Sequence, residues 1–100
     1  MELVFRAISD PTRRQLLERL GRSPASVSEL AQPFDLALPS IVQHLRILER
    51  SGLVRSRKVG RVRTFQLAPE GLQPAEDWLA GQRSLWERSL DQLVAHPQTM

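Results

Sequence analysis

The sequence contains no cysteine. This absence excludes disulfide bonds, thiolate metal sites and cysteine nucleophiles, and it fits a reducing cytoplasm. Apolar runs are only a few residues long, whereas a membrane-spanning helix needs about 20 apolar residues. The first six residues (MELVFR) lack the basic and apolar regions of a secretory signal peptide. We therefore expect a cytoplasmic protein that has no membrane partner.

Groups needed for catalysis and metal binding are also scarce. Histidine occurs only at His44 and His96, and a metal such as zinc needs several nitrogen or sulfur ligands that converge. The sequence shows no nucleophile–base pair, no glycine-rich phosphate loop and no paired carboxylates at a suggestive spacing. These absences predict a protein that is not an enzyme, holds no cofactor and does not sense metal.

Positive charge is concentrated in one third of the chain. Residues 36–67 contain one acid, Glu49, and seven basic residues, so their net charge is +6, whereas that of the whole chain is +3. Such a concentration makes a field that attracts a polyanion. The alternative is a solvated basic face that binds nothing. The seven basic residues are Arg46, Arg50, Arg55, Arg57, Lys58, Arg61 and Arg63.

The N-terminal part of the chain predicts two helices, over residues 2–9 and 11–20, from the helical spacing of their apolar residues. Asp10 is suited to cap the second helix because it precedes Pro11, which needs no N–H at a helix start. Gly21 is expected to end that helix. Residues 26–27 are compatible with a very short strand. We treat residues 1–100 as one small domain.

Two further helices joined by a turn are predicted over residues 28–51. Ser28 is expected to cap the first, and Pro33 and Asp35 mark its end. The second spans about residues 38–51, where Gly52 stops it. This arrangement is a helix-turn-helix. Its expected buried residues are Leu30, Ala31 and Phe34 in the first helix and Ile41, Leu45 and Leu48 in the second.

A β-hairpin is predicted next, with strands over residues 53–58 and 62–67 and a tight turn at residues 59–61. A basic hairpin directly after a helix-turn-helix has the position of a wing. A long final helix is expected over residues 70–95. The predicted fold is therefore mainly α, a winged helix-turn-helix of about five helices and a two-stranded wing.

Polar side chains on the second helix of the helix-turn-helix point away from its apolar side. Ser, Gln and Arg hydrogen bond to base edges or phosphates in a DNA major groove. Taken alone, this pattern also fits an ordinary amphipathic helix, but the adjacent basic wing favours nucleic-acid binding. The predicted DNA-binding residues are Ser40, Gln43, His44 and Arg46 on the helix and Arg57, Lys58, Arg61 and Arg63 on the wing.

Apolar residues recur every seven positions along the last helix, which is too apolar to be buried by so small a domain. We predict that this face, together with the N-terminal helix, forms a homodimer interface. The alternative is that these residues belong to the core, as Trp78 and Leu85 on another face could. The predicted interface residues are Leu3, Phe5, Leu72, Ala75, Leu79, Trp86, Leu90 and Leu93.

Four segments resemble the ArsR/SmtB family of winged helix repressors: residues 5–14 (FRAISDPTRR), 28–31 (SELA), 38–54 (LPSIVQHLRILERSGLV) and 59–61 (VGR). The two tryptophans of the last helix are similar to a metal-independent branch. The resemblance implies a homodimer that represses transcription by blocking a promoter, often its own.

The chain departs from the pattern of that family at two positions. Ala37 stands where the family commonly has Ser, so an N-cap is missing, and Val42 stands where a DNA-contacting Ser is usual. These departures indicate a different operator. In this helix the resemblance therefore extends only to Ser40, Gln43, His44 and Arg46.

The sequence thus predicts a homodimeric, sequence-specific repressor that binds double-stranded DNA at a roughly palindromic operator and does not sense metal. The alternative function is a winged helix that serves as a protein-interaction module, with the basic hairpin docking an acidic partner. The sequence neither supports nor excludes a small-molecule inducer. It does not specify the operator or the regulated genes.

Overall fold

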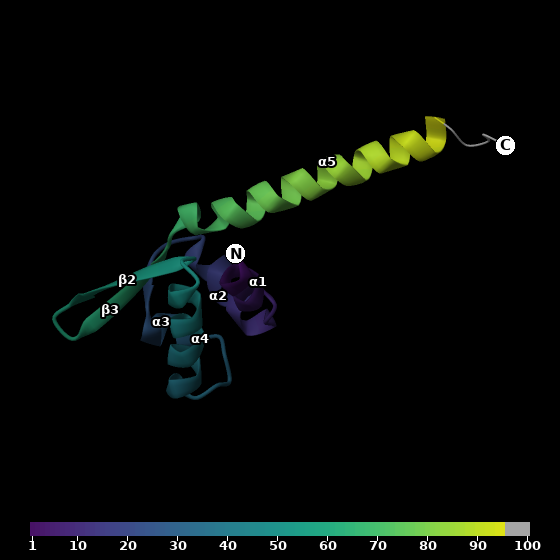
Figure 1. Cartoon of the computed structure of the whole chain (residues 1–100). Coiled ribbons are helices and arrows are strands. Elements are labelled where there is room, and N and C mark those ends of the chain that lie inside the picture. Colours follow the sequence, from purple (N-terminus) through teal and green to yellow (C-terminus); the bar gives the residue numbers. More distant parts are fainter. Residues whose placement is uncertain (96–100) are drawn as a thin grey trace.

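The computed structural model describes residues 1–95, so His96, one of the two histidines, lies outside the described residues. Figure 1 shows a small helical body from which a hairpin projects on one side and a long helix on the other. In chain order the elements are α1 (Glu2–Ile8), α2 (Pro11–Leu20), β1 (Ala25–Ser26), α3 (Val27–Ala31), α4 (Leu38–Arg50), β2 (Val54–Val59), β3 (Val62–Leu67), the 3₁₀ helix η1 (Pro69–Leu72) and α5 (Gln73–Ala95).

Helix α4 lies at the centre of the core. Ile41, Leu45 and Leu48 are fully buried, as their i, i+4, i+7 spacing predicts. They pack in one hydrophobic cluster with Leu16 of α2 and Leu30 of α3. The helix therefore presents its opposite side to solvent and is held in a fixed orientation by its buried side.

The N-terminus of α3 differs from the sequence-based prediction, because Ser26 is the N-cap and Ser28 is not. The Ser26 hydroxyl accepts a hydrogen bond from the Glu29 N–H at 3.3 Å, and the Glu29 carboxylate accepts one from the Ser26 N–H at 3.0 Å. The backbone bond from Ser26 also lowers the pKa of Glu29. Ser26 and Glu29 have the three-residue separation that a capping box requires. The helix ends at Ala31, so the half-buried Phe34 lies beyond it.

This cap gives a direct test. We expect Ser26→Ala to lower the free energy of unfolding by about 1 kcal/mol, because it leaves the first turn of α3 without its side-chain acceptor. Ser28→Ala should change it by less than about 0.5 kcal/mol, since Ser28 is exposed. Urea denaturation of the two variants measures the difference. Equal losses in both variants would refute the assignment of the cap.

The sheet has three strands in the order β1-β3-β2, so the short strand at residues 25–26 adds to the predicted hairpin. Ala25 pairs with Phe65, which ties the hairpin to the body. Val59 pairs with Val62, and the turn therefore has only two residues, Gly60 and Arg61. Gly60 has φ +64°, a left-handed value that a two-residue hairpin turn requires and that glycine adopts without strain.

The last helix begins later than predicted, at Gln73 instead of Glu70. A continuous α-helix from Glu70 would need the N–H of residue 74 to bond to the carbonyl of residue 70, and Pro74 has no N–H. Residues 69–72 form the 3₁₀ helix η1 instead. Helix α5 then extends away from the body, so that the molecule measures 70 × 26 × 22 Å.

Candidate nucleic-acid interface

The outward side of α4 carries three of the predicted DNA-binding residues. Ser40, Gln43 and Arg46 are all exposed, and they lie on the side of the helix opposite its buried leucines. Ala37 at the N-cap makes no side-chain hydrogen bond, while Pro39 occupies the first turn. Polar groups on a helix that the core holds rigidly are suited to a DNA major groove.

His44 lies on the same helix but is turned toward α2. Its Nδ1 atom lies 3.2 Å from an Arg13 guanidinium nitrogen and 3.9 Å from the Asp10 carboxylate. Arg13 also donates hydrogen bonds to the carbonyl oxygens of Ala7, at 2.7 Å, and Arg6, at 3.0 Å. His44 therefore joins α4 to α1 and α2, and its ring is oriented by these contacts instead of projecting with Gln43.

Asp10 begins α2 as predicted. Its carboxylate accepts a hydrogen bond from the Arg13 N–H at 3.0 Å, and this bond lowers the pKa of Asp10. Burial acts in the opposite direction and raises the pKa of Asp10, while the electrostatic effect of His44 lowers it. Arg13 was not selected from the sequence, although it follows Asp10 at the three-residue separation that brings a helix cap and its partner together.

The strand register divides the basic residues of the wing (residues 54–67) between two faces. Lys58 pairs directly with Arg63, so these two side chains lie on one face. Arg57 pairs with Thr64 and points to the opposite face. The wing cations that were predicted to bind DNA therefore do not share one surface, because Arg57 lies on the other face from Lys58 and Arg63. The Lys58–Arg63 pair places like charges opposite each other, which is unfavourable unless an anion lies nearby.

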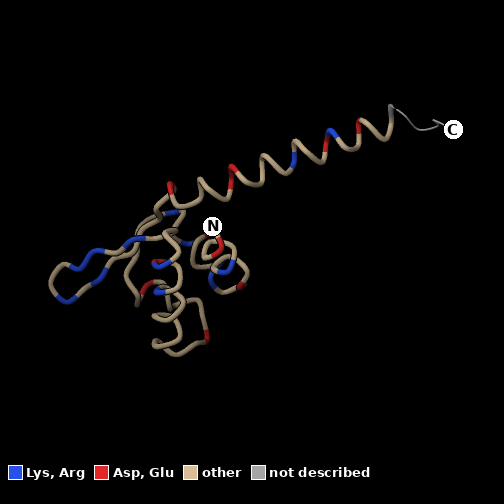
Figure 2. The backbone as a smooth tube through the Cα atoms, in the orientation of Figure 1, with Lys and Arg blue, Asp and Glu red and all other residues tan. Residues whose placement is uncertain are grey.

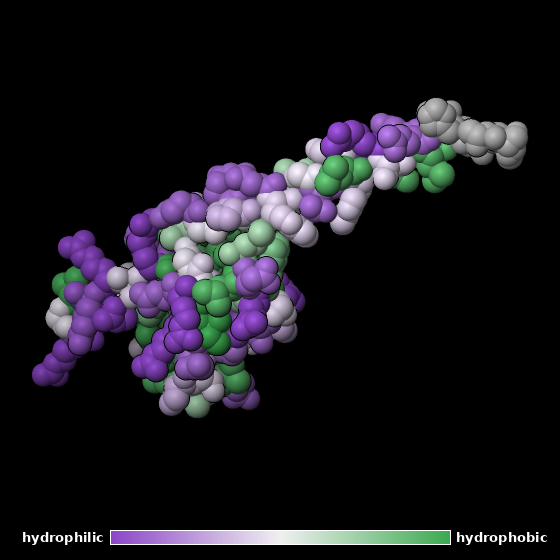
Figure 3. Space-filling view, in the orientation of Figure 1, coloured by the Kyte–Doolittle hydropathy of each residue, from purple (hydrophilic) through white to green (hydrophobic). Residues whose placement is uncertain are grey.

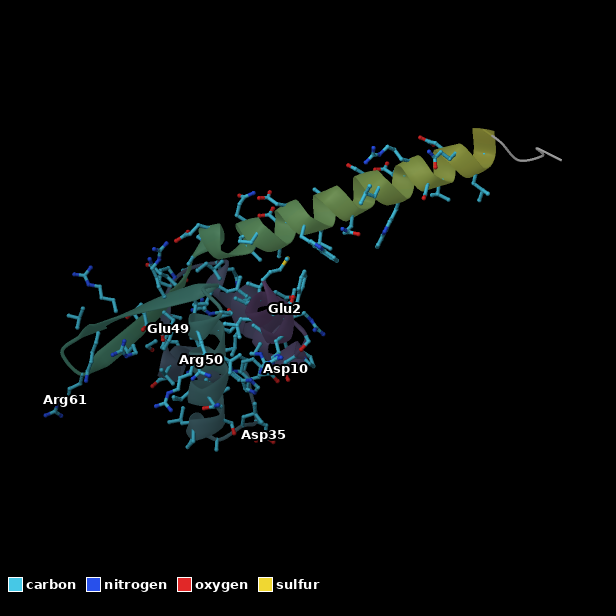
Figure 4. The ribbon with its side chains drawn as sticks, in the orientation of Figure 1. Glu2, Asp10, Asp35, Glu49, Arg50 and Arg61 are labelled. Carbon is cyan, nitrogen blue, oxygen red and sulfur yellow. The ribbon has the colours of Figure 1, made fainter. Side chains whose placement is uncertain are left out.

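The ends of the wing differ in their surroundings. At its base, Arg55 forms an ion pair with Glu70 at 2.8 Å, so its charge is partly neutralised within the chain. At its tip, Arg61 lies in the exposed turn, well away from α4 (Figure 4). Figure 2 shows that Lys and Arg follow both strands of the hairpin out to this turn. The wing therefore carries its free positive charge along its outer half.

A hollow of about 500 Å³ separates α4 from the wing. Arg46 of α4 and Arg63 of β3 both line it, together with Val42 of α4. The fold thus brings together two predicted DNA-binding residues that are 17 positions apart in the sequence. Its full lining is Val27, Val42, Arg46, Glu49, Arg63 and Phe65.

Comparisons with known proteins agree with this geometry. Residues 8–57 match the model of a family described as "Helix-turn-helix domain". Over 79 residues the chain is 34% identical to the transcriptional repressor SdpR of Bacillus subtilis, with 79% of this chain and 88% of that protein covered. It is 41% identical over 68 residues to the HTH-type transcriptional regulator Rv2034 of Mycobacterium tuberculosis, with 68% of this chain and 64% of that protein covered.

A crystal structure of an ArsR family transcriptional regulator is similar over most of the fold. Its sequence is 53% identical, the TM-score is 0.82, and the alignment covers 86% of this chain and 89% of that one. This chain belongs to the ArsR family. It is therefore a winged helix-turn-helix transcriptional regulator, and the relatives that it matches are regulators and not enzymes.

The ArsR family chain has an exposed apolar face on α5, visible as green patches beyond the body in Figure 3. The exposed fraction is 41% for Leu72 in η1, just before α5, and within α5 it is 50% for Leu79 and 68% for Leu93. The prediction for Ala75 needs correction, because it is 4% exposed and belongs to the core of its own chain. The exposed residues at predicted interface positions are Leu3, Leu72, Leu79, Trp86, Leu90 and Leu93.

Phe5 of α1 and Trp78 of α5 contact each other within one chain. The rings of Phe5 and Trp78 meet edge to face, with their centroids 5.8 Å apart. Phe5 is half-buried and packs against the core, so it supports the base of α5. Trp78 and Leu85 are 44% and 50% exposed, so the alternative that places them in the core is wrong.

Over residues 1–95, no group of three or more His, Cys, Asp or Glu side chains is placed to hold a metal ion. None of the helices in this part of the ArsR family chain is both long and apolar enough to span a bilayer.

Proposed function

We propose that this ArsR family protein is a homodimeric repressor that acts in the cytoplasm by binding a roughly palindromic operator in double-stranded DNA. The observation that carries the proposal is the hollow between α4 and the wing, where Arg46 and Arg63 face one space from two elements. A duplex presents bases in its groove and phosphates along the edge of that groove. A polar helix is suited to contact the bases in the groove, and the basic hairpin beside it is suited to contact the phosphates along the edge.

Each element has a distinct task in this proposal. Ser40, Gln43 and Arg46 contact base edges or phosphates in the major groove, since Gln binds adenine and Arg binds guanine through paired hydrogen bonds. Lys58, Arg61 and Arg63 contact phosphates from the wing. Arg57 binds phosphate from the other face of the hairpin, and His44 contributes by orienting α4. The charge contacts supply affinity for any duplex, whereas Gln43 supplies preference for sequence.

A second copy of the chain is the partner that best suits the apolar face of α5. Large exposed apolar patches on a small protein usually mark an interface, and Leu3 of α1 is exposed as well. Two-fold pairing would place the two α4 helices about 34–36 Å apart, one turn of DNA. We further propose that binding does not depend on metal, because the described residues offer no converging ligand set.

Two substitutions test the DNA-binding site. Once a preferred duplex has been selected from a random pool, Gln43→Ala should reduce discrimination at one base pair by about 1–3 kcal/mol. Arg61→Ala should weaken binding to all sequences alike and reduce the slope of log K against log salt by about one unit. Mobility shifts at several salt concentrations measure both effects.

Arg88→Ala is the matched control, because it removes the same charge from an exposed position on α5. It should leave specificity unchanged and alter affinity less than Arg61→Ala does. If Gln43→Ala and Arg61→Ala both bind like the original protein, the site is wrongly assigned. If the original protein binds no duplex even in low salt, the protein-interaction alternative replaces the proposal.

A further inference from the structure

The hydroxyl of Ser56 links the wing to α4. It donates a hydrogen bond to the Glu49 carboxylate at 2.7 Å and accepts one from an Arg63 guanidinium nitrogen at 2.8 Å. Glu49 lies on α4, Ser56 on β2 and Arg63 on β3, so three elements meet at one oxygen atom. Figure 4 shows Glu49 on the side of α4 that faces the hairpin.

Ser56 lies where the exposed outer part of the wing begins. Residues 57–63 are all exposed, whereas Ser56 is half-buried and lies beside the buried Phe65. In the described part of the chain, the Ser56–Glu49 bond is the one side-chain hydrogen bond between the wing and α4. Without it, the exposed half of the hairpin would be attached to the body only through its strands, of which β3 pairs with β1 as far as Thr64.

The charges of this link matter for a DNA-binding surface. Glu49 is the single acid of residues 36–67, and a free carboxylate at the rim of the hollow would repel phosphate. Here the Glu49 carboxylate instead accepts a hydrogen bond from Ser56, and the same Ser56 hydroxyl accepts one from Arg63. Hydrogen bonds that involve charged groups are stronger than neutral ones and fix direction as well as distance. A fixed Arg63 loses less rotamer entropy when it binds an anion.

We propose that Ser56 is a positioning residue for DNA binding: it holds Arg63 against α4 so that Arg63 and Arg46 receive one backbone phosphate in the hollow between them. The inference rests on the DNA-binding function proposed above and adds a residue that does not itself contact DNA. In this arrangement α4 and the wing meet the duplex as one rigid unit. Loss of the Ser56 hydroxyl leaves Arg63 present but unrestrained.

A double-mutant cycle with a selected operator duplex tests the proposal. We expect Ser56→Ala and Arg63→Ala each to weaken binding, by roughly fivefold and roughly tenfold, because one loses the orientation of the cation and the other its charge. The double variant should bind no more weakly than Arg63→Ala alone, since Ser56 acts through Arg63. Multiplied effects in the double variant would overturn the proposal, as would unchanged binding by Ser56→Ala.

Further variants separate positioning from folding. Ser56→Thr keeps the hydroxyl and should restore at least half of the lost affinity. Thr64→Val removes a hydroxyl from the opposite face of the wing and should change affinity by less than about twofold. Failure of Ser56→Thr to restore binding, or an equal loss in Thr64→Val, would refute a specific role for the Ser56 bridge.

Glu49→Ala keeps the proposal testable even if Ser56→Ala does not fold. Removal of a negative charge beside DNA would by itself tighten binding, whereas loss of the link should weaken it by a few-fold. Tighter binding would contradict the proposal.

Amide hydrogen exchange without DNA gives a separate readout, in which Ser56→Ala should speed exchange in residues 57–63. If Ser56→Ala exchanges faster but the original protein binds no duplex, the link between the wing and α4 stands and only the DNA-binding function is overturned. If exchange in Ser56→Ala is unchanged, the link itself is overturned.

Discussion

Replacing Trp86 by Glu is expected to convert the protein to a monomer and to reduce its affinity for a palindromic operator by a hundredfold or more. Trp86 is 64% exposed in the single chain, so its removal costs the core nothing. In a two-fold dimer each substitution acts twice. A buried Trp removes about 150–250 Å² of surface from water, and Glu would place an unpaired charge in the same position at a cost of several kcal/mol.

In the proposed dimer the operator affinity depends on this pairing, because each domain contacts one half-site. When two half-sites are joined in one particle, the second binding event is effectively intramolecular, which raises affinity by a factor of about 10² to 10⁴. The monomeric variant should therefore bind a half-site duplex as well as the original protein does. Sedimentation velocity measures the oligomeric state, and mobility shifts on full-site and half-site duplexes measure the two affinities.

Ser84→Glu is the matched control, because it adds the same charge two residues away. Two residues correspond to about 200° around a helix, so Ser84 lies on the far side from Trp86. This variant should remain a dimer and keep its operator affinity. If Trp86→Glu stays dimeric while Ser84→Glu does not, the apolar face has been assigned to the wrong side of α5.

Gly71→Ala should lower the free energy of unfolding by about 2–4 kcal/mol, because the added methyl group overlaps fixed backbone atoms. A Cβ atom on Gly71 would lie 2.1 Å from the carbonyl oxygen of Gly52 and 3.2 Å from the nitrogen of Leu53. No side-chain rotation relieves such a contact. The N–H groups of Gly52 and Leu53 donate hydrogen bonds to the carbonyls of Glu49 and Leu48, so the backbone there cannot shift freely.

The same substitution tests how α5 is held relative to α4. The Gly71–Gly52 contact joins η1, which precedes α5, to the end of α4, and a backbone bond of 2.8 Å from the Ala68 N–H to the Leu53 carbonyl lies beside it. Displacement of η1 would change the angle of α5 and with it the separation of the two α4 helices in a dimer. The operator affinity of Gly71→Ala should therefore fall by more than the loss of folded protein accounts for.

Gly81→Ala is the control with the opposite expected sign. Gly81 lies within α5 and a Cβ atom there has no neighbour within 4 Å in the chain. Alanine is favoured over glycine in a helix by about 1 kcal/mol, so this variant should be equally stable or more stable. Denaturation curves must share one protein concentration, because dimer stability depends on it. Similar losses in both variants would contradict the close contact at Gly71.

Elements set by short-range signals were predicted well from the sequence. The spacing of Ile41, Leu45 and Leu48 identified the buried side of α4, and Asp10 before Pro11 marked the start of α2. Gly60 located the hairpin turn because few other residues adopt its backbone conformation. Helix periodicity, caps and tight turns depend on neighbours within four residues, so the sequence carries the information directly.

Features that depend on strand register or on distant contacts were missed or misplaced. Arg57 was grouped with Lys58 and Arg63, but the pairing of β2 with β3 sends it to the other face. Ser26 was overlooked as a cap in favour of Ser28, although its spacing from Glu29 was available as a signal. Ala75 has the periodicity of the α5 face and yet is buried by its own chain.

By itself, the sequence determined the winged helix-turn-helix order of elements, the polar side of α4 and the basic character of the wing, because periodicity and charge are local properties. Tertiary structure alone decided which of these side chains meet. It brought Arg46 and Arg63 to one hollow, linked Ser56 to Glu49, and turned His44 toward Asp10 and Arg13. Such meetings depend on how helices and strands pack over long chain separations, which no local pattern encodes.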